Sequence, residues 1–160
     1  MNELNKLFEH TLMDVYYAEH EILKALPKLA GKAKSPELKK AFEAHLTQTE
    51  GHVKRLDKIF KLLGKPPKAV KCEAIIGILK EGDEVIADFA TSSALDAGMI
   101  AAAQAVEHYE MARYGALRTW ATELKMSEAA KLLEETLLEE RGTDQTLTAL
   151  AEKKINLMAA

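Results

Sequence analysis

The stretch VEHYEMARYGAL, residues 106–117, places acidic side chains among the apolar positions of a predicted helix. At about 100° per residue, Val106, Tyr114 and Leu117 lie on one face of that helix. Glu110 falls near the centre of the same face, and Glu107 lies one turn before it, at the edge. Because a carboxylate buried without a partner is costly in free energy, these two acids indicate a polar site inside the protein.

The same helical periodicity continues in both directions along the chain, and no segment alternates apolar and polar residues as a strand does. Four long helices are predicted, over about residues 3–30 and 36–63, from a start at residues 93–96 to about 124, and over about 128–155. Their predicted starts are marked by Ser35-Pro36-Glu37, by a capping box over Ser93 to Asp96, and by Ser127 as a cap. Their predicted ends are marked by Gly31 and by Gly64-Lys65-Pro66-Pro67.

Residues 69–90 differ from the rest, because Gly77 and Gly82 are expected to break them into short helical pieces. We therefore predict a long crossover here, with short links between the other neighbouring helices. A single long crossover is typical of ferritin-like proteins, whereas simple up-and-down bundles have only short loops. The chain is predicted to be all-α, as a single ferritin-like four-helix bundle over residues 1–160 with a long helical crossover between helices two and three.

The composition argues against several classes of protein. The net charge is −3 and no basic block is present, so nucleic-acid binding is not expected. No apolar run is long enough to span a membrane, and the N-terminal segment lacks the apolar core of a signal peptide. The lone Cys72 cannot form an internal disulfide, so we expect a cytoplasmic protein.

Polar side chains also fall on the buried faces of the other three long helices, at about the same height as the two acids. They are Glu19 in the first helix, His45, Thr49 and His52 in the second, and Glu140 and Asp144 in the fourth. No lysine or arginine points inward at that height, so the carboxylates would repel one another unless cations neutralised them. Carboxylates with a few imidazoles suit iron or manganese. The sequence therefore predicts a metal site, and one bridging carboxylate would let it hold two ions.

Other interpretations of these residues stay open. Glu107 and Glu110 could form a hydrogen-bonded, partly protonated layer with His45, and His45 could also be an ordinary core histidine. His52 and Asp144 could be outer partners that orient a ligand rather than ligands themselves. A tyrosine side chain beside a di-iron site could act as an electron carrier.

The residues also resemble a known family. The resemblance rests on DVYYAEHEILKALPKLA, FEAHLTQTEGHVKRLDKIF, KCEAIIGILKEGDEVI, AAAQAVEHYEMARYGAL and AAKLLEETLLEERGTD. These stretches are similar to the YciE/YciF-like bacterial stress-response family, a ferritin-like group long labelled a domain of unknown function. The resemblance covers nearly the whole chain and implies a ferritin-like bundle, homodimers, a di-metal site and a link to bacterial stress. It implies no established reaction.

More distantly, the polar layer resembles the di-iron site of rubrerythrins. That site takes one Glu from the first helix, Glu-x-x-His from the second and fourth, and Glu-x-x-Glu from the third. Glu19 matches the first element, and Glu107-x-x-Glu110 matches the third. Both Glu-x-x-His elements are missing, since Gly142 and Thr143 stand where the histidine of the fourth helix would follow Glu139 or Glu140.

Two functions are compatible with this pattern. In the first, two iron ions, or manganese in their place, are held by Glu19, His45, Glu107, Glu110 and Glu140 and react with peroxide or oxygen. In the second, the protein is a non-catalytic helical dimer that binds a partner or sequesters metal without turnover, as the missing Glu-x-x-His elements suggest. A cage-forming iron store is a weaker third possibility.

Overall fold

The structure is a computed structural model, and it describes residues 2–160. Within that range every regular element is helical and no strand is present, so the predicted all-α class is confirmed. The elements are α1 (Glu3–Lys32), α2 (Pro36–Leu62), α3 (Glu73–Asp88), α4 (Leu95–Glu123), α5 (Ser127–Leu150), a π-helical turn η1 (Ala151–Ile155) and α6 (Asn156–Ala159).

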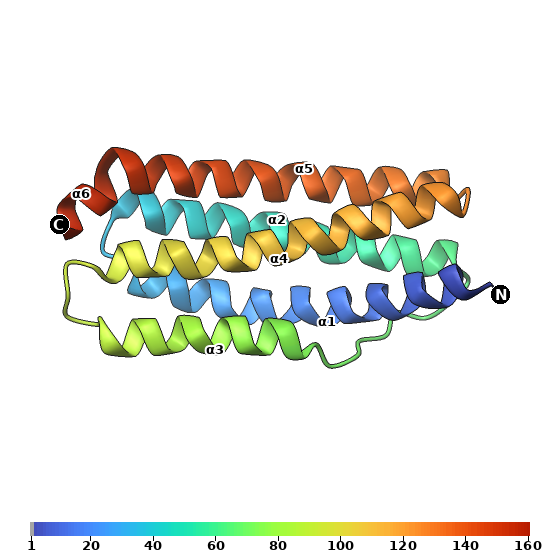
Figure 1. The fold of residues 1–160 in the computed structure, drawn as a ribbon, viewed down its shortest axis with the longest axis horizontal. Coiled ribbons are helices and arrows are strands. Elements are labelled where there is room, and N and C mark those ends of the chain that lie inside the picture. Colours follow the sequence, from blue (N-terminus) through green and yellow to red (C-terminus); the bar gives the residue numbers. More distant parts are fainter. Residues whose placement is uncertain (1) are drawn as a thin grey trace.

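The four long helices α1, α2, α4 and α5 lie side by side along the length of the molecule (Figure 1). Helix α1 packs against α2 and α4, and α5 packs against the same two helices, which encloses a core between all four. Helix α3 covers the outside of α1 and α4. The chain after α2 returns along the molecule before α3 begins, so α4 starts at the same end as α2 (Figure 1).

Local sequence explains how the first two helices begin. The Asn2 side chain accepts a hydrogen bond from the Asn5 backbone amide at 2.8 Å, which caps α1. The Ser35 side chain caps α2 in the same way, and Pro36 occupies its first turn, as predicted. Helix α2 ends before Gly64, whose φ of 68° lies in the left-handed region that glycine adopts without steric cost.

Two sequence predictions about where helices break or end are wrong. Residues 73–88 form one unbroken helix, because Gly77 and Gly82 lie inside α3 without interrupting it. A Cβ atom on Gly82 would lie 3.5 Å from the Ala102 Cβ, an ordinary van der Waals distance, so the packing of α3 on α4 does not require a glycine at this position. Helix α1 runs past Gly31 and ends at Lys32.

Neither predicted cap in the second half of the chain forms. Helix α4 begins at Leu95 without a side-chain cap. The Asp96 carboxylate instead accepts hydrogen bonds from the backbone amides of Lys34 and Ser35, at 2.9 and 2.7 Å. It therefore ties the link between α1 and α2 to the start of α4. Ser127 is the first residue of α5 rather than its cap.

The apolar core is divided into two clusters. One includes Ile22, Phe42, Met99, Ile100 and Leu147, and lies toward the end of the molecule where α4 begins. The other includes Phe8, Leu12, Leu56, Leu117 and Leu133, and lies toward the opposite end. The buried acids and histidines lie between these clusters along each long helix. Each helix in residues 2–160 is too short or too polar to cross a membrane.

Candidate metal centre

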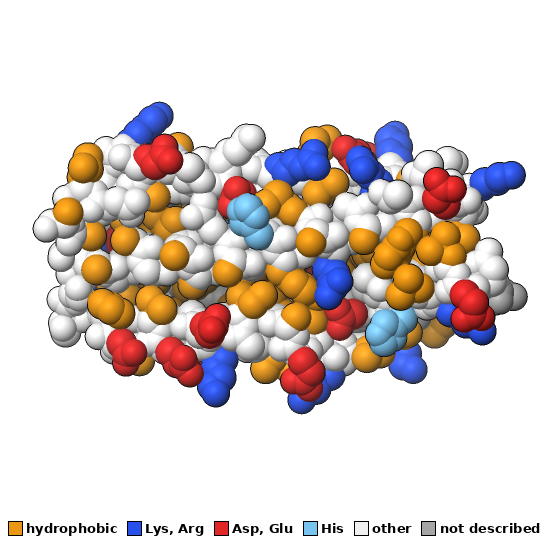
Figure 2. Space-filling model, in the orientation of Figure 1, with side chains coloured by type: hydrophobic (Ala, Val, Ile, Leu, Met, Phe, Trp, Pro, Cys, Tyr) orange, Lys and Arg blue, Asp and Glu red, His pale blue; other side chains and the backbone are white. Residues whose placement is uncertain are grey.

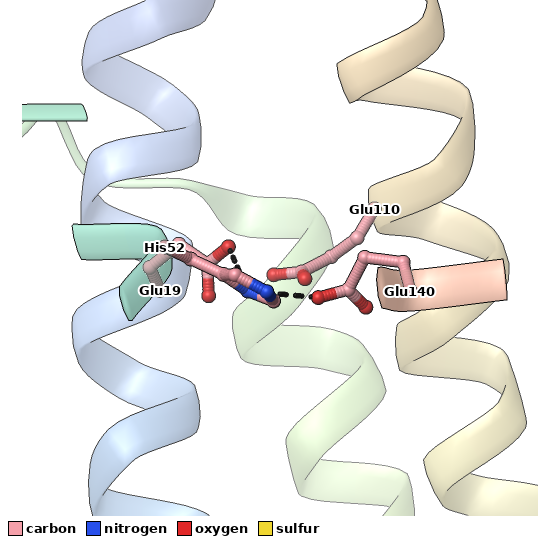
Figure 3. Close-up of side chains that lie close together, drawn as sticks. All are labelled: Glu19, His52, Glu110 and Glu140. Carbon is pink, nitrogen blue, oxygen red and sulfur yellow. Dashed lines mark ion pairs between the residues drawn. The ribbon is translucent and has the colours of Figure 1, made fainter. Parts of the chain in front are cut away.

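Four buried side chains, one from each long helix, point toward one another in the middle of the molecule (Figure 3). They are Glu19 from α1, His52 from α2, Glu110 from α4 and Glu140 from α5. One ligand atom of each lies within 4.8 Å of one ligand atom of every other. Helical periodicity explains the convergence, because each residue continues the apolar face of its own helix.

A second group adjoins the first. It consists of His45, Glu107 and Glu140, again with one ligand atom of each within 4.8 Å of the others. Glu140 belongs to both groups, so its carboxylate lies between the two sets of ligands. The structure thus brings together six of the seven predicted ligands as two adjacent groups that share one carboxylate.

The two imidazoles face the carboxylates at short range. His45 Nε2 lies 2.8 Å from Glu107 Oε1. His52 Nδ1 lies 2.9 Å from Glu140 Oε1 and 3.3 Å from Glu19 Oε1. Neither facing nitrogen has a hydrogen-bond partner, because these contacts have ion-pair distances without hydrogen-bond geometry.

Buried polar atoms that lack hydrogen-bond partners indicate whether a metal ion fits this site. Eight buried side-chain atoms of the described chain lack a hydrogen-bond partner. They are both oxygens of Glu110 and Glu140, one oxygen each of Glu19 and Glu107, His45 Nε2 and His52 Nδ1. Buried polar atoms without partners are rare in folded proteins. Their convergence from two groups fits divalent cations that accept oxygen and imidazole donors.

The pKa shifts of two of these acids also indicate that a cation fits this site. Burial, followed by the negative charges of Glu140, Glu19 and Glu107, raises the pKa of Glu110 well above its usual range. Burial, followed by the close contact with Glu107 and the charge of that residue, likewise raises the pKa of Glu140. Without a cation, these two carboxyls therefore hold protons that a bound metal would displace.

The pKa values of Glu107 and His52 shift in the directions that favour their charged forms. Burial alone would raise the pKa of Glu107, but its close contacts with Glu140 and His45 outweigh burial and lower the pKa. Burial alone would lower the pKa of His52, but its close contact with Glu19 and the nearby negative charges raise it to about 8. The apo layer therefore contains ionised and protonated groups that partly compensate one another.

An outer ion pair orients His52. Its Nε2 lies 3.0 Å from Glu139 Oε2, on the side of the ring away from the layer. Both Glu139 oxygens accept hydrogen bonds from the Arg55 guanidinium, at 2.8 and 2.7 Å. A carboxylate in this position fixes the ring and directs the Nδ1 lone pair toward a metal. Sequence analysis did not assign this role to Glu139 or Arg55, because both lie beside the buried faces of their helices.

Tyr114 also contacts the layer, although sequence analysis had treated it mainly as a packing residue. Its hydroxyl donates a 2.5 Å hydrogen bond to Glu19 Oε1, and its side chain is 1% exposed. Burial, followed by the charge of Glu19, raises the pKa of Tyr114 well above its usual range. Its position one turn after Glu110 is a signal that could have identified this contact.

Asp144 lies apart from both groups. Its carboxylate accepts from Gln104 at 3.3 Å and lies 3.3 Å from His108 Nε2, toward the surface between α4 and α5. The buried Thr49 hydroxyl donates to the His45 carbonyl within its own helix, at 2.8 Å. The structure therefore separates Asp144 from the other predicted ligands.

Comparisons with known proteins identify relatives over nearly the whole chain. The family model described as "Domain of unknown function (DUF892)" matches residues 3–160. Protein YciF of Escherichia coli (strain K12) is 43% identical over 160 residues, which cover 99% of this chain and 96% of that protein.

Solved structures are similar as well. The crystal structure of the E. coli stress protein YciF gives a TM-score of 0.92 at 43% identity, covering 98% of this chain and 99% of that chain. YcfI from Rhodopseudomonas palustris gives 0.89 at 43% identity, covering 92% and 94%. Protein XCC3681 from Xanthomonas campestris is 21% identical, and its TM-score of 0.77 over 98% of this chain and 96% of that chain shows a shared fold alone.

Proposed function

This chain belongs to the DUF892 family as a homologue of the stress protein YciF, and we propose that it is a bacterial stress-response protein with a buried di-metal centre. The proposed centre holds two iron ions, or manganese in their place, and reacts with peroxide or oxygen. The observation that carries the proposal is the pair of adjacent ligand groups joined by Glu140, whose carboxylate is 0% exposed and has no donor.

The residues divide between the two ions by their grouping. Glu19, His52 and Glu110 would hold one ion, His45 and Glu107 would hold the other, and Glu140 would bridge them. When bound, a ferrous pair supplies two electrons, which with two protons reduce one hydrogen peroxide to two waters.

The surrounding residues orient the ligand side chains and keep water out of the site. Glu139 keeps His52 in position, and the Tyr114 hydroxyl holds Glu19 through its hydrogen bond. The protons held by Glu110 and Glu140 in the apo protein leave when metal binds, which couples metal affinity to pH. The apolar clusters on both sides of the layer keep bulk water away from the reacting pair.

Anaerobic loading with ferrous ion, followed by elemental analysis, tests the centre. We expect about two ions per chain, and rapid ferrous oxidation when peroxide or oxygen is mixed in. Glu110→Ala should abolish both, whereas Asp144→Ala, which lies outside the groups, should keep both. A protein that takes up neither iron nor manganese would refute the proposal.

A second candidate function is metal sequestration or partner binding without turnover. It is favoured by Thr143, which stands three residues after Glu140 and donates its hydroxyl to Gln48 at 2.9 Å rather than supplying an imidazole. The layer is therefore poor in nitrogen ligands. A protein that binds two ferrous ions but oxidises them no faster than buffer does would support this function over the first.

We also propose that residues 1–160 form one ferritin-like four-helix bundle, and that the protein is a cytoplasmic homodimer. The enclosed packing of α1, α2, α4 and α5, with its long link before α4, supports the bundle. The family resemblance supports the dimer. Size-exclusion chromatography with light scattering should give twice the chain mass of 17.7 kDa, whereas a cage-sized particle would favour iron storage.

A further inference from the structure

A small apolar cavity adjoins the metal centre on the side of His45 and Glu107. Its volume is about 20 Å³, which is room for one molecule the size of water. Apart from His45, Glu107 and Thr143 at one end, the lining side chains are apolar. A small uncharged molecule in this cavity would therefore contact mainly carbon atoms, with the polar groups of His45 and Glu107 beside it.

A larger groove of about 250 Å³ lies outside this cavity, among α1, α3 and α4. Hydrophobic side chains gather over these helices on the face shown in Figure 2. The groove and the cavity share five lining residues, which are Ala25, Leu29, Leu79, Ala103 and Val106. The groove and the cavity therefore lie against the same side chains, and movements of these side chains could connect the two spaces.

The charges at the edge of the groove are paired with one another. Lys28 contacts Asp83 at 2.7 Å, and Lys24 contacts Glu21 at 2.7 Å. Paired charges above apolar walls give an approaching ion neither a binding partner nor a hydrated path. The groove therefore suits an uncharged and poorly hydrated molecule.

A different approach to the layer is polar. Between α2 and α5, a pocket of about 110 Å³ reaches the other side of His45, and its lining includes Gln48, Thr143 and Thr146. Its hydroxyl and amide groups suit a hydrated cation or peroxide. The two sides of His45 thus differ in chemistry, with an apolar side toward α1 and α3 and a polar side toward the surface.

We propose that the groove and the inner cavity form a passage that delivers dioxygen to the His45–Glu107 side of the metal centre. This inference rests on the proposed function and identifies dioxygen as the oxidant. Oxidation of two ferrous ions to ferric ions releases two electrons, which with two protons reduce one dioxygen to hydrogen peroxide. Dioxygen is uncharged, weakly hydrated and small enough for the inner cavity.

Krypton binding tests the passage without any metal, because this heavy uncharged atom enters dry apolar cavities and is located by its anomalous scattering. Crystals of apo protein under krypton pressure should show a peak beside Ala103 and Val106. Ala103→Leu, which fills the shared wall, should remove that peak. Ala105→Leu makes the same substitution at an exposed position of the same helix and should keep it.

Stopped-flow mixing of ferrous-loaded protein with dioxygen tests delivery. Ala103→Leu should slow oxidation about tenfold or more while leaving anaerobic iron stoichiometry unchanged. Leu79→Phe narrows the passage from the side of helix α3, where Leu79 is partly exposed. It should slow oxidation in the same way, and it replaces Ala103→Leu if that variant folds poorly. Wild-type rates in a variant that has lost the krypton peak would overturn the passage, as would absence of the peak from the wild type. A chain that binds krypton but no metal would instead refute the proposed function.

Discussion

Replacing Glu110 by leucine should stabilise the metal-free protein although it removes a ligand of the proposed metal centre. The Glu110 side chain is 1% exposed, and neither oxygen has a hydrogen-bond donor. Burial and the charges of Glu140, Glu19 and Glu107 raise its pKa, so folding of the apo protein requires it to hold a proton. Leucine is similar in size and needs neither a proton nor a partner.

The expected gain follows from typical costs of such groups. A buried polar group without a partner costs about 1–3 kcal/mol. Replacing buried ionic groups by apolar ones of similar volume has stabilised other proteins by about 1–4 kcal/mol. We therefore expect Glu110→Leu to raise the apo free energy of unfolding by about 2 kcal/mol at neutral pH. For a chain of this length, that corresponds to a melting temperature higher by about 4–8 °C.

The gain should also grow with pH. The pKa of Glu110 is raised above its ordinary value of 4.5, so above that pH the folded apo protein keeps a proton that the unfolded chain releases. Wild-type stability from this group is full below the unfolded-state pKa and is lost as pH rises through the folded-state pKa. The loss is at most about 1.4 kcal/mol per pH unit for one proton. The variant lacks this group and should lose less stability between pH 5 and pH 8, a range of about three units.

Thermal unfolding followed by circular dichroism, with a chelator present at pH 5, 7 and 8, measures both effects. Glu50→Leu makes the same change at an exposed position in the middle of α2 and should shift the melting temperature little. The reasoning fails if Glu110→Leu destabilises the apo protein by about 2 kcal/mol or more, since the layer would then be a stabilising hydrogen-bonded network. A gain that is equal at all three pH values would refute the role assigned to the raised pKa.

Three further substitutions probe the surroundings of the layer. Glu139→Leu should weaken divalent metal binding about 10–100-fold in calorimetric titrations, because the imidazole loses its outer partner. Glu135→Leu removes the other carboxylate beside the same arginine and should leave affinity nearly unchanged. Tyr114→Phe should lower apo stability by about 1–3 kcal/mol, since Glu19 loses its buried donor, and an unchanged melting temperature would show that the bond contributes little. Asp96→Ala should destabilise apo and metal-loaded protein alike by about 2–4 kcal/mol, because two backbone amides lose a charged acceptor, and a change in metal affinity would contradict its purely structural role.

Helical periodicity was enough to predict the long helices, because their apolar faces repeat over many turns. The continuity of α3 was not predictable in the same way. Gly77 and Gly82 each disfavour a helix by about 1 kcal/mol relative to alanine, but packing against α1 and α4 outweighs that preference. The starts of α4 and α5 were also misjudged, because Asp96 binds backbone amides in a distant link and Ser127 begins its helix instead of capping it.

The sequence predicted which side chains face the core at the site, but not which of them contact one another across helices. The angle of a residue on its helix indicates which side chains face the core, and it identified Glu19, Glu107, Glu110 and Glu140. It does not indicate how neighbouring helices are rotated about their own axes. Asp144 shares a face with Glu140 on an ideal helix but contacts Gln104 and His108 instead of the layer. For the same reason, no pattern within one helix could pair Glu139 with His52.

The division of the apolar core into two clusters has a consequence for cooperativity. Every long helix contributes to both clusters, but the layer between them contains eight buried polar atoms without hydrogen-bond partners. Each half can therefore lose protection against hydrogen exchange without forcing the other half to open at the same moment. Bound cations would attach all four helices at one level and make the two halves unfold as a unit. Metal would then control how sharply the molecule unfolds as well as how stable it is.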